Sequence, residues 1–315
     1  MKGFQINKGQ SKNKKNSDYI NKIYDKAIHS HQNGDLIKAK EYYNQCLNKG
    51  MNTPGLLCNY AVLFKQQGNI KEAINLYKKA ISLYPEYSDS YHNYGNLLYI
   101  QKNLDEAEII VGKAITLKPK FSLSHYLLAQ ILIEKKKFID AKYSLQKVIL
   151  LNEKFIPAYL KLSEVLILLK DNKEAKNILL KSIKVSPNSV ESYVNLGAIL
   201  IDSNEFKEAE KVTQKAIRLD PNLSVAYNNL GSIYRENGKL NESESFVRKA
   251  IEINPKYSKA LSLLGTILLE KNEPEEAKKY WLQALEYNPK LNDVFFKLGK
   301  LYYHEQNFTE AIKYF

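Results

Sequence analysis

The chain has 315 residues, of which 44% are hydrophobic and 26% charged, and its formal net charge is +13. This hydrophobic content is enough for a packed interior, so the composition excludes a chain that is disordered throughout. The longest apolar runs are far shorter than the roughly 18 residues of a transmembrane helix. The two cysteines, Cys46 and Cys58, are too few and wrongly spaced for a disulfide framework or a zinc site. These features predict a cytoplasmic protein without a metal or other cofactor.

The positive charge raises the question of nucleic-acid binding. Only three of the 47 basic residues are arginines: Arg218, Arg235 and Arg248. Arginine is the side chain best suited to bidentate contacts with phosphates and bases, whereas lysines commonly solvate protein surfaces. The composition therefore argues against a nucleic-acid surface, which stays a distant alternative.

The first segment, residues 1–17, is polar and rich in Lys, Asn and Gln. It lacks the apolar stretch of a signal peptide, and it predicts a disordered tail. The remainder, residues 18–315, is organised differently.

A 34-residue period runs through that remainder. Six prolines fall 34 or 68 residues apart, at Pro85, Pro119, Pro187, Pro221, Pro255 and Pro289. If these prolines are placed at position 32 of a repeat, the array has eight full repeats and a ninth that breaks off. The repeats then begin at Ile20, Pro54, Ser88, Ser122, Ile156, Val190, Ser224, Ser258 and Asn292.

Each repeat predicts two helices, A and B, joined by a short turn. Small residues recur at positions 8, 20 and 27, and large ones at positions 4, 7 and 24. Spacings of three and four place these positions on single helix faces, where small side chains let two helix axes approach closely. Glycines at position 15 (Gly34, Gly68 and Gly238) are suited to end helix A in a left-handed conformation.

This pattern resembles the tetratricopeptide repeat (TPR) family over about residues 20–315. Repeat seven carries it best, with the segment Tyr227-Asn-Asn-Leu-Gly231 followed by Tyr234, Gly238, Ala250 and Pro255. The resemblance implies an all-α, right-handed superhelix in which helix A lines a concave groove and helix B faces outward. Arrays of this family ordinarily bind peptides or partner proteins, and a protein-binding scaffold is the function that we expect.

Given that fold, positions 2, 5, 6, 9, 12 and 13 of helix A face the groove. These positions hold nine acidic residues and six basic ones, among them Arg235. A nucleic-acid groove needs basic charge along its track, so this tally again favours a protein or peptide partner.

Asparagine occupies position 6 in four repeats, as Asn59, Asn93, Asn195 and Asn229, with Asn96 and Asn228 at neighbouring groove positions. An asparagine amide pairs with a peptide backbone whatever its sequence. The row is similar to the asparagine ladder in the repeat domain of O-linked N-acetylglucosamine transferases. The alternative is that position 6 merely tolerates a residue that is common in this chain.

Between these asparagines the predicted groove turns apolar, with Leu127 and Ile167 as central members. Such a patch predicts a contact surface, on which aspartate at both positions abolishes binding and leaves the helices intact. The alternative is that neighbouring A helices bury these side chains.

No enzymatic motif stands out from the repeats. The five histidines show no metalloprotease spacing, and neither cysteine has a general base in view. The chain stops within helix B of repeat nine, which suggests two further expectations. It is either the substrate-targeting half of a larger glycosyl- or sulfo-transferase, or a protein that self-associates through an uncapped last repeat.

Overall fold

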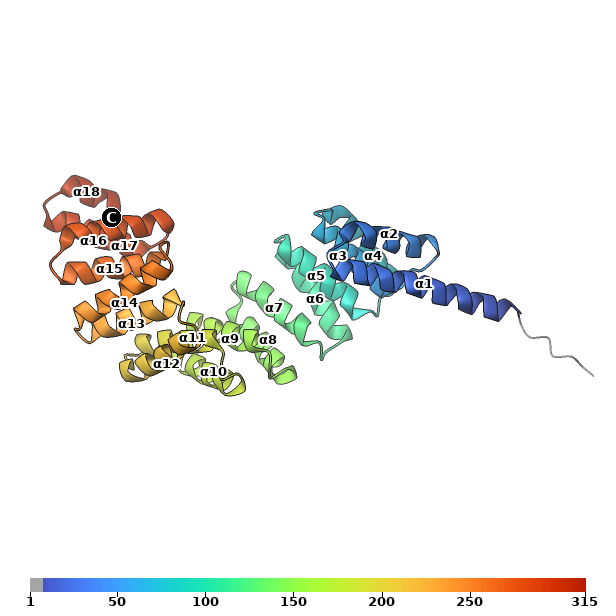
Figure 1. Cartoon of the computed structure of the whole chain (residues 1–315), viewed down its shortest axis with the longest axis horizontal. Coiled ribbons are helices and arrows are strands. Elements are labelled where there is room, and N and C mark those ends of the chain that lie inside the picture. Colours follow the sequence, from blue (N-terminus) through green and yellow to red (C-terminus); the bar gives the residue numbers. More distant parts are fainter. Residues whose placement is uncertain (1–7) are drawn as a thin grey trace, which may run out of the picture. The chain divides into compact units, whose positions relative to one another are not determined.

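The computed structural model describes residues 8–315, with side chains from Ser17 onward, and in this range helices follow one another with short turns between them (Figure 1). The A helices are α1 (Lys8–Gln32), α3 (Pro54–Gln66), α5 (Ser88–Ile100), α7 (Ser122–Glu134), α9 (Ile156–Leu168), α11 (Val190–Asp202), α13 (Ser224–Glu236), α15 (Ser258–Glu270) and α17 (Asn292–His304). The B helices are α2 (Leu36–Asn48), α4 (Ile70–Leu83), α6 (Leu104–Leu117), α8 (Phe138–Leu151), α10 (Asn172–Val185), α12 (Phe206–Leu219), α14 (Leu240–Ile253), α16 (Pro274–Tyr287) and α18 (Phe308–Tyr314). The predicted all-α repeat fold is confirmed.

The helix starts follow the sequence period. From repeat two to repeat nine, every A helix begins on the first residue of its repeat. Helix α1 differs, because it begins at Lys8 and runs into the segment for which the sequence predicts disorder. Buried Ile20 and Ile23 anchor this helix, and a helix propagates more easily than it nucleates. Residues 1–7 of the predicted tail lie outside the described residues.

Every A helix ends in the same left-handed turn. Position 15 has a positive φ in all nine repeats, between 59° and 79°. In repeat two the N–H of Asn69 donates to the carbonyl oxygen of Phe64 at 2.9 Å, and the N–H of Gly68 donates to Lys65 at 3.1 Å. This Schellman pattern satisfies the last carbonyls of helix A and reverses the chain into helix B.

Sequence reasoning identified only the three glycines of this turn. The other six residues with positive φ are Lys102, Lys136, Lys170, Asn204, Asn272 and Gln306. Lysine and glutamine carry no local signal for a left-handed conformation, so the hydrogen bonds of the turn impose it there.

Within each repeat, position 8 of helix A packs against position 24 of helix B. Glycine stands at position 8 where position 24 is Val, Thr, Trp or Phe, and Ala or Ser stands there where position 24 is Tyr or Leu. A Cβ atom on Gly265 would lie 2.6 Å from two ring atoms of Trp281, and one on Gly197 would lie 2.7 Å from Thr213 Oγ1. The two positions are therefore matched in size repeat by repeat.

Positions 3 and 10 of helix A also belong to the core, which the sequence analysis missed. Position 10 is buried and aliphatic in eight repeats, and its residues are Leu63, Leu97, Ile131, Val165, Ile199, Ile233, Ile267 and Leu301. Position 3 is buried in the same repeats, often with a small side chain such as Ser124 or Ala226. The aliphatic residues at position 10 and the small residues at position 3 are both visible when the repeats are aligned.

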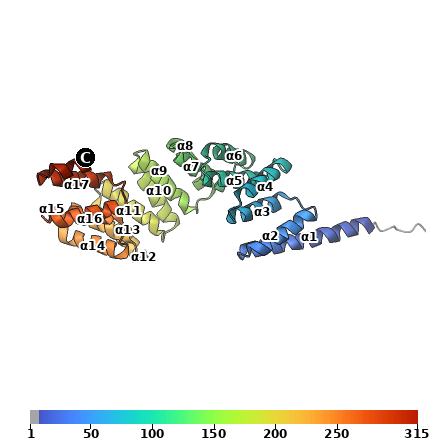
Figure 2. The same cartoon turned by 90° about the horizontal axis from the view of Figure 1, so that it is seen from above.

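The chain divides into two compact units, residues 1–152 and residues 153–315. Within each unit, each B helix packs on its own A helix and on the next A helix, as α13 to α16 do in the C-terminal unit (Figures 1 and 2). Among the helices of residues 8–315, none has the length and apolarity needed to cross a bilayer.

Candidate functional site

The inner groove positions 5 and 6 of helix A lie against the neighbouring A helix, so many of their side chains hold the stack together. Asn59 Nδ2 donates to the Tyr24 hydroxyl at 2.9 Å, and Asn229 Nδ2 donates to the Val194 carbonyl oxygen at 3.4 Å. Asn229 is only 7% exposed. For these two asparagines the structure therefore shows a role in packing, as a buried amide requires.

The remaining asparagines of the predicted row are half-buried. Asn93 hydrogen-bonds the Cys58 thiol, and burial raises the pKa of that thiol. The side chains of Asn96 and Asn195 make no hydrogen bond to other residues in the described part of the chain. Asn59, Asn93 and Asn96 belong to the N-terminal unit, whereas Asn195, Asn228 and Asn229 belong to the C-terminal unit.

The expectation that Leu127 is exposed is wrong. Its side chain is 4% exposed and packs in a cluster with Tyr94, Leu97 and Ile131. Aspartate at this position would disrupt the core, so the double aspartate variant cannot separate binding from folding. Ile167 is 41% exposed at the end of α9, as the sequence predicts. Leu127 and Ile167 belong to different units.

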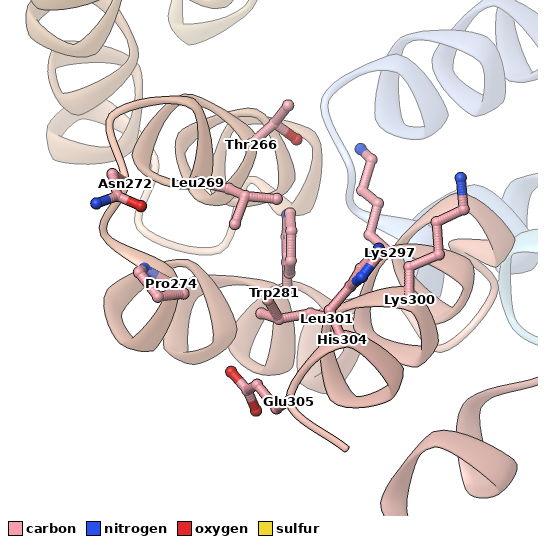
Figure 3. Close-up of a pocket in the computed structure, with 10 residues that line it drawn as sticks. All are labelled: Thr266, Leu269, Asn272, Pro274, Trp281, Lys297, Lys300, Leu301, His304 and Glu305. Carbon is pink, nitrogen blue, oxygen red and sulfur yellow. The ribbon is translucent and has the colours of Figure 1, made fainter. Parts of the chain in front are cut away.

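Two adjoining hollows open on the A-helix side of the C-terminal unit. The first has a volume of about 470 Å³ and lies where α15, α16 and α17 meet (Figure 3). The fully buried Trp281 ring lies at the base of this hollow with Leu269 beside it, while Lys297 and Lys300 project along one side. The Trp281 indole N–H donates to the Ser262 carbonyl oxygen at 3.0 Å, which fixes the ring. We call this the tryptophan hollow.

The second hollow, of about 280 Å³, lies across α13, α15 and α17. Most of its lining residues are of polar type, among them Asn228, Ser232 and Lys259, and it shares Thr266 and Lys297 with the tryptophan hollow. We call it the asparagine hollow. Nearly all of its lining residues occupy groove positions of the repeats.

Asn228, a lining residue of this hollow, has an unsatisfied group. Its side-chain oxygen Oδ1 is buried, and none of the described residues donates a hydrogen bond to it. A buried carbonyl oxygen without a donor costs about 1–3 kcal/mol. Rotation of the amide toward the hollow would let a ligand N–H reach this oxygen and remove that cost.

The cations of the two hollows differ in how they are neutralised. Arg235 pairs with Glu270 at 3.0 Å and with Glu236 at 2.9 Å, so its charge is committed within the protein. Lys297 pairs with Asp293 at 3.1 Å. Lys300 lies 4.7 Å from the centre of the Phe296 ring.

Lys259, unlike Arg235 and Lys297, has no acidic partner among the described residues. Among the described residues, no carboxylate forms an ion pair with it or with Lys300. The rim of the hollows therefore offers positive charge to a ligand.

Sequence reasoning identified part of this site. It selected Asn228 and Arg235, and it counted Lys259, Lys297 and Lys300 among the groove bases without assigning them to a site. It missed the hollow at Trp281, because position 24 reads only as core. Such a hollow depends on how three helices diverge, which no single column of the alignment records.

The described residues contain no cluster of three or more His, Cys, Asp and Glu side chains suited to a metal ion. Cys46 and Cys58 are free thiols, both buried, and burial raises the pKa of each. A thiol with a raised pKa is a poor nucleophile at neutral pH.

Sequence models of the tetratricopeptide repeat family match residues 64–131, 156–189, 190–223, 224–257 and 262–315. Together these matches cover well over half of the chain. The chain belongs to the tetratricopeptide repeat family.

Solved structures show the same fold. A tetratricopeptide repeat protein from Parabacteroides merdae is 17% identical, with a TM-score of 0.63 over 82% of this chain and 98% of its own. YrrB, a TPR protein described as having an unusual peptide-binding site, is 24% identical, with a TM-score of 0.50 over 59% of this chain and 95% of its own. The Cut9 complex with Hcn1 gives 14% identity and a TM-score of 0.59 over 88% of this chain and 55% of that one. No curated protein sequence matches the chain.

Proposed function

We propose that this chain is a protein-interaction scaffold that binds an extended peptide across the A-helix face of its C-terminal unit. The observation that carries the proposal is a hollow lined by groove positions, in which Asn228 is a lining residue whose amide oxygen has no donor within the described part of the protein. Rotation of the Asn228 amide toward the hollow would offer this oxygen to a peptide backbone N–H.

The surroundings of Asn228 suit the rest of a peptide. The tryptophan hollow next to it has Leu269, Trp281 and Leu301 in its lining, and its volume is in the range of about 300–1,000 Å³ found for ligand pockets. An apolar side chain of the peptide would occupy it, while Lys259 and Lys300 would face the polar flanks. YrrB supports the proposal only as an example of the same fold with a peptide site.

The same proposal includes no catalytic step for this segment. It locates the protein in the cytoplasm, where the two buried cysteines would stay reduced. Asn93 and Asn96 of the N-terminal unit, and Asn195 and Ile167 of the C-terminal unit, remain candidate contacts for other parts of a partner.

Selection from a random peptide display library, followed by titration of the selected peptides, tests the proposal. Asn228→Leu removes the amide with little change in volume, and we expect it to weaken binding by at least about tenfold. The matched control is Asn241→Leu, the same substitution on the exposed outer face of α14 in the same repeat. We expect it to leave the affinity unchanged.

A loss of binding in Asn228→Leu is not expected to come from a loss of stability. The substitution removes a buried oxygen that has no partner and should not lower the unfolding midpoint. Equal affinities of the Asn228→Leu and Asn241→Leu variants would exclude the A-helix hollows as the binding site. Failure of the library to yield any binder would refute the proposal as a whole.

A further inference from the structure

The outer side of the C-terminal unit contains a separate hollow, and position 23 of helix B belongs to its lining. In repeat eight, position 23 is Tyr280, whose ring lies 5.9 Å from the guanidinium carbon of Arg248 at position 25 of the preceding repeat. In repeat six, position 23 is Val212, and the corresponding position 25 residue is Leu180. This smaller pair lines a hollow of about 420 Å³ between α10, α11 and α12.

The lower part of this outer hollow is apolar. Leu180, Tyr193, Leu196, Leu200 and Val212 line it. Leu180 is 45% exposed although it is a large aliphatic side chain. The hydroxyl of Tyr193 donates to the Pro187 carbonyl oxygen at 3.2 Å, so the ring is held in place. Water in contact with this surface would be displaced favourably by an apolar group.

The rim of the outer hollow is positively charged. Lys176, Lys211, Lys215 and Arg218 line it, with Glu208 as the one acidic lining residue. Lys176 is neutralised by Glu205 at 2.6 Å and Glu208 at 3.4 Å.

The other three cations are free of such pairing. Within residues 17–315, no carboxylate lies within ion-pair distance of Lys211, Lys215 or Arg218. Helices α10 and α12 add four more exposed lysines, namely Lys173, Lys181, Lys184 and Lys207, against two further acidic residues, Glu174 and Glu210. This face therefore concentrates part of the net charge of the chain.

We infer that the outer hollow binds an acidic segment of another protein, which inserts one bulky apolar side chain between α10 and α12. The unpaired cations select carboxylates by charge, and the recessed apolar surface selects a side chain. A membrane surface fits less well, because Leu180 is the one exposed residue of the apolar lining and the other four are buried or half-buried. A nucleic acid fits less well, because Arg218 is the only arginine at the rim.

This site is independent of the proposed peptide site. It is lined by residues of α10, α11 and α12, and it shares no residue with the tryptophan hollow or the asparagine hollow. A variant that closes it therefore leaves the A-helix face unchanged.

The test uses the full chain and a fluorescein-labelled peptide of glutamates and aspartates with one central phenylalanine, followed by fluorescence anisotropy. Val212→Phe introduces the residue that Phe246 provides in the next repeat, and it fills the hollow. The double substitution Lys211→Glu with Lys215→Glu replaces two positive charges at the rim by negative ones. The matched control, Lys78→Glu with Lys79→Glu, makes the same charge change on the exposed face of α4, where Lys79 has the same repeat position as Lys215.

We expect saturable binding by the native chain. Val212→Phe, the Lys211/Lys215 reversal and replacement of the peptide phenylalanine by alanine should each weaken it by at least about tenfold. The Lys78/Lys79 reversal should leave it within about twofold. Because Lys211 and Lys215 are not core residues, their double variant keeps the test valid even if Val212→Phe lowers stability.

The inference is overturned if the peptide does not bind, or if its affinity is the same in the Val212→Phe and Lys211/Lys215 variants as in the native chain. It is also overturned if phosphatidylserine vesicles or single-stranded RNA bind through Lys211 and Lys215 while the peptide does not.

Discussion

At the scale of single residues, the contact between positions 8 and 24 determines how closely the two helices of a repeat approach. Gly265 illustrates this, because a Cβ there would meet two Trp281 ring atoms at 2.6 Å and the Ala277 carbonyl oxygen at 2.9 Å. The ring cannot move freely, since its N–H is hydrogen-bonded to Ser262.

We expect Gly265→Ala to lower the free energy of unfolding by about 1–3 kcal/mol through overpacking, as measured by urea denaturation. Gly112→Ala is the matched control, since Gly112 lies within α6 and a Cβ there meets no heavy atom within 4 Å. Alanine at that position should stabilise the helix by up to about 1 kcal/mol. Equal effects of the two substitutions would contradict the size matching.

Thr213 is a second residue where the repeats can be compared. It occupies position 24 opposite Gly197, and its hydroxyl is buried without a hydrogen-bond partner among the described residues. Repeats three and seven have the near-isosteric Val111 and Val247 at this position, also opposite glycine.

Thr213→Val should therefore raise the free energy of unfolding by about 1 kcal/mol, because it removes an unsatisfied polar atom. Thr266→Val should have the opposite effect, since Thr266 Oγ1 donates to the Ser262 carbonyl oxygen at 3.0 Å. Thermal unfolding followed by circular dichroism compares the two. A destabilised Thr213→Val variant would indicate a partner for the hydroxyl that we have not identified.

At the scale of the helix pair, the left-handed turn at position 15 is required by the fold and not by the local sequence. Lys136 adopts a φ of 59°, and Gly68 adopts 76° at the same position. A left-handed conformation costs a non-glycine residue about 1–2 kcal/mol.

We expect Lys136→Gly to stabilise the protein by about 0.5–1 kcal/mol, after the entropic cost of glycine is subtracted. Gly68→Ala should destabilise it by a similar amount, about 1 kcal/mol. Lys147→Gly, on an exposed position within α8, is the control and should also destabilise. Urea unfolding midpoints measure all three, and a loss of stability in Lys136→Gly would show that this turn carries no strain.

The boundaries of the helix pairs could be predicted from the sequence, but the contacts between neighbouring pairs could not. The period of 34 residues located the start of every A helix from α3 to α17, because proline at position 32 and the small residues recur in register. It could not separate a groove asparagine from one that bonds the next helix. Asn228 and Asn229 are adjacent in sequence, yet one has an unpartnered oxygen and the other donates to Val194. That difference depends on how neighbouring A helices are spaced.

The apolar positions show the same limit. The sequence predicts that Leu127 and Ile167 are both exposed in the groove. In the structure Leu127, at position 6, packs against the preceding A helix, whereas Ile167, at position 12, lies near the end of its helix. The period defines the fold well, and the hollows follow from side-chain sizes in three helices at once.

At the scale of the whole molecule, pH provides a test of how the N-terminal unit is held together. His92 on α5 approaches Ser124 Oγ on α7 with its Nδ1 at 3.1 Å and packs on the Phe121 ring. Burial lowers the pKa of His92, and the nearby Asp89 carboxylate opposes this shift only in part.

The pKa of His92 is lower in the folded state than in the unfolded chain. As the pH falls below about 6.5, His92 is therefore protonated to a greater extent in the unfolded chain. The stability contributed by neutral His92 is therefore fully present above that pH and is lost as the pH falls toward the folded pKa. We expect His92→Asn to reduce the loss of stability between about pH 7.5 and pH 5.5, as measured by urea unfolding. A steeper loss in the variant would contradict the sign of the shift.

The proposed function requires that a partner peptide lies across α13, α15 and α17. The direct measurement uses a peptide selected against the Val212→Phe variant, in which the outer hollow is filled. That peptide, labelled with a photoreactive group, is cross-linked to the native chain and the adducts are mapped by mass spectrometry. We predict adducts at Asn228, Ser232 and Lys259 or at their neighbours in the two A-helix hollows. Adducts confined to the outer faces of the B helices would contradict the claim.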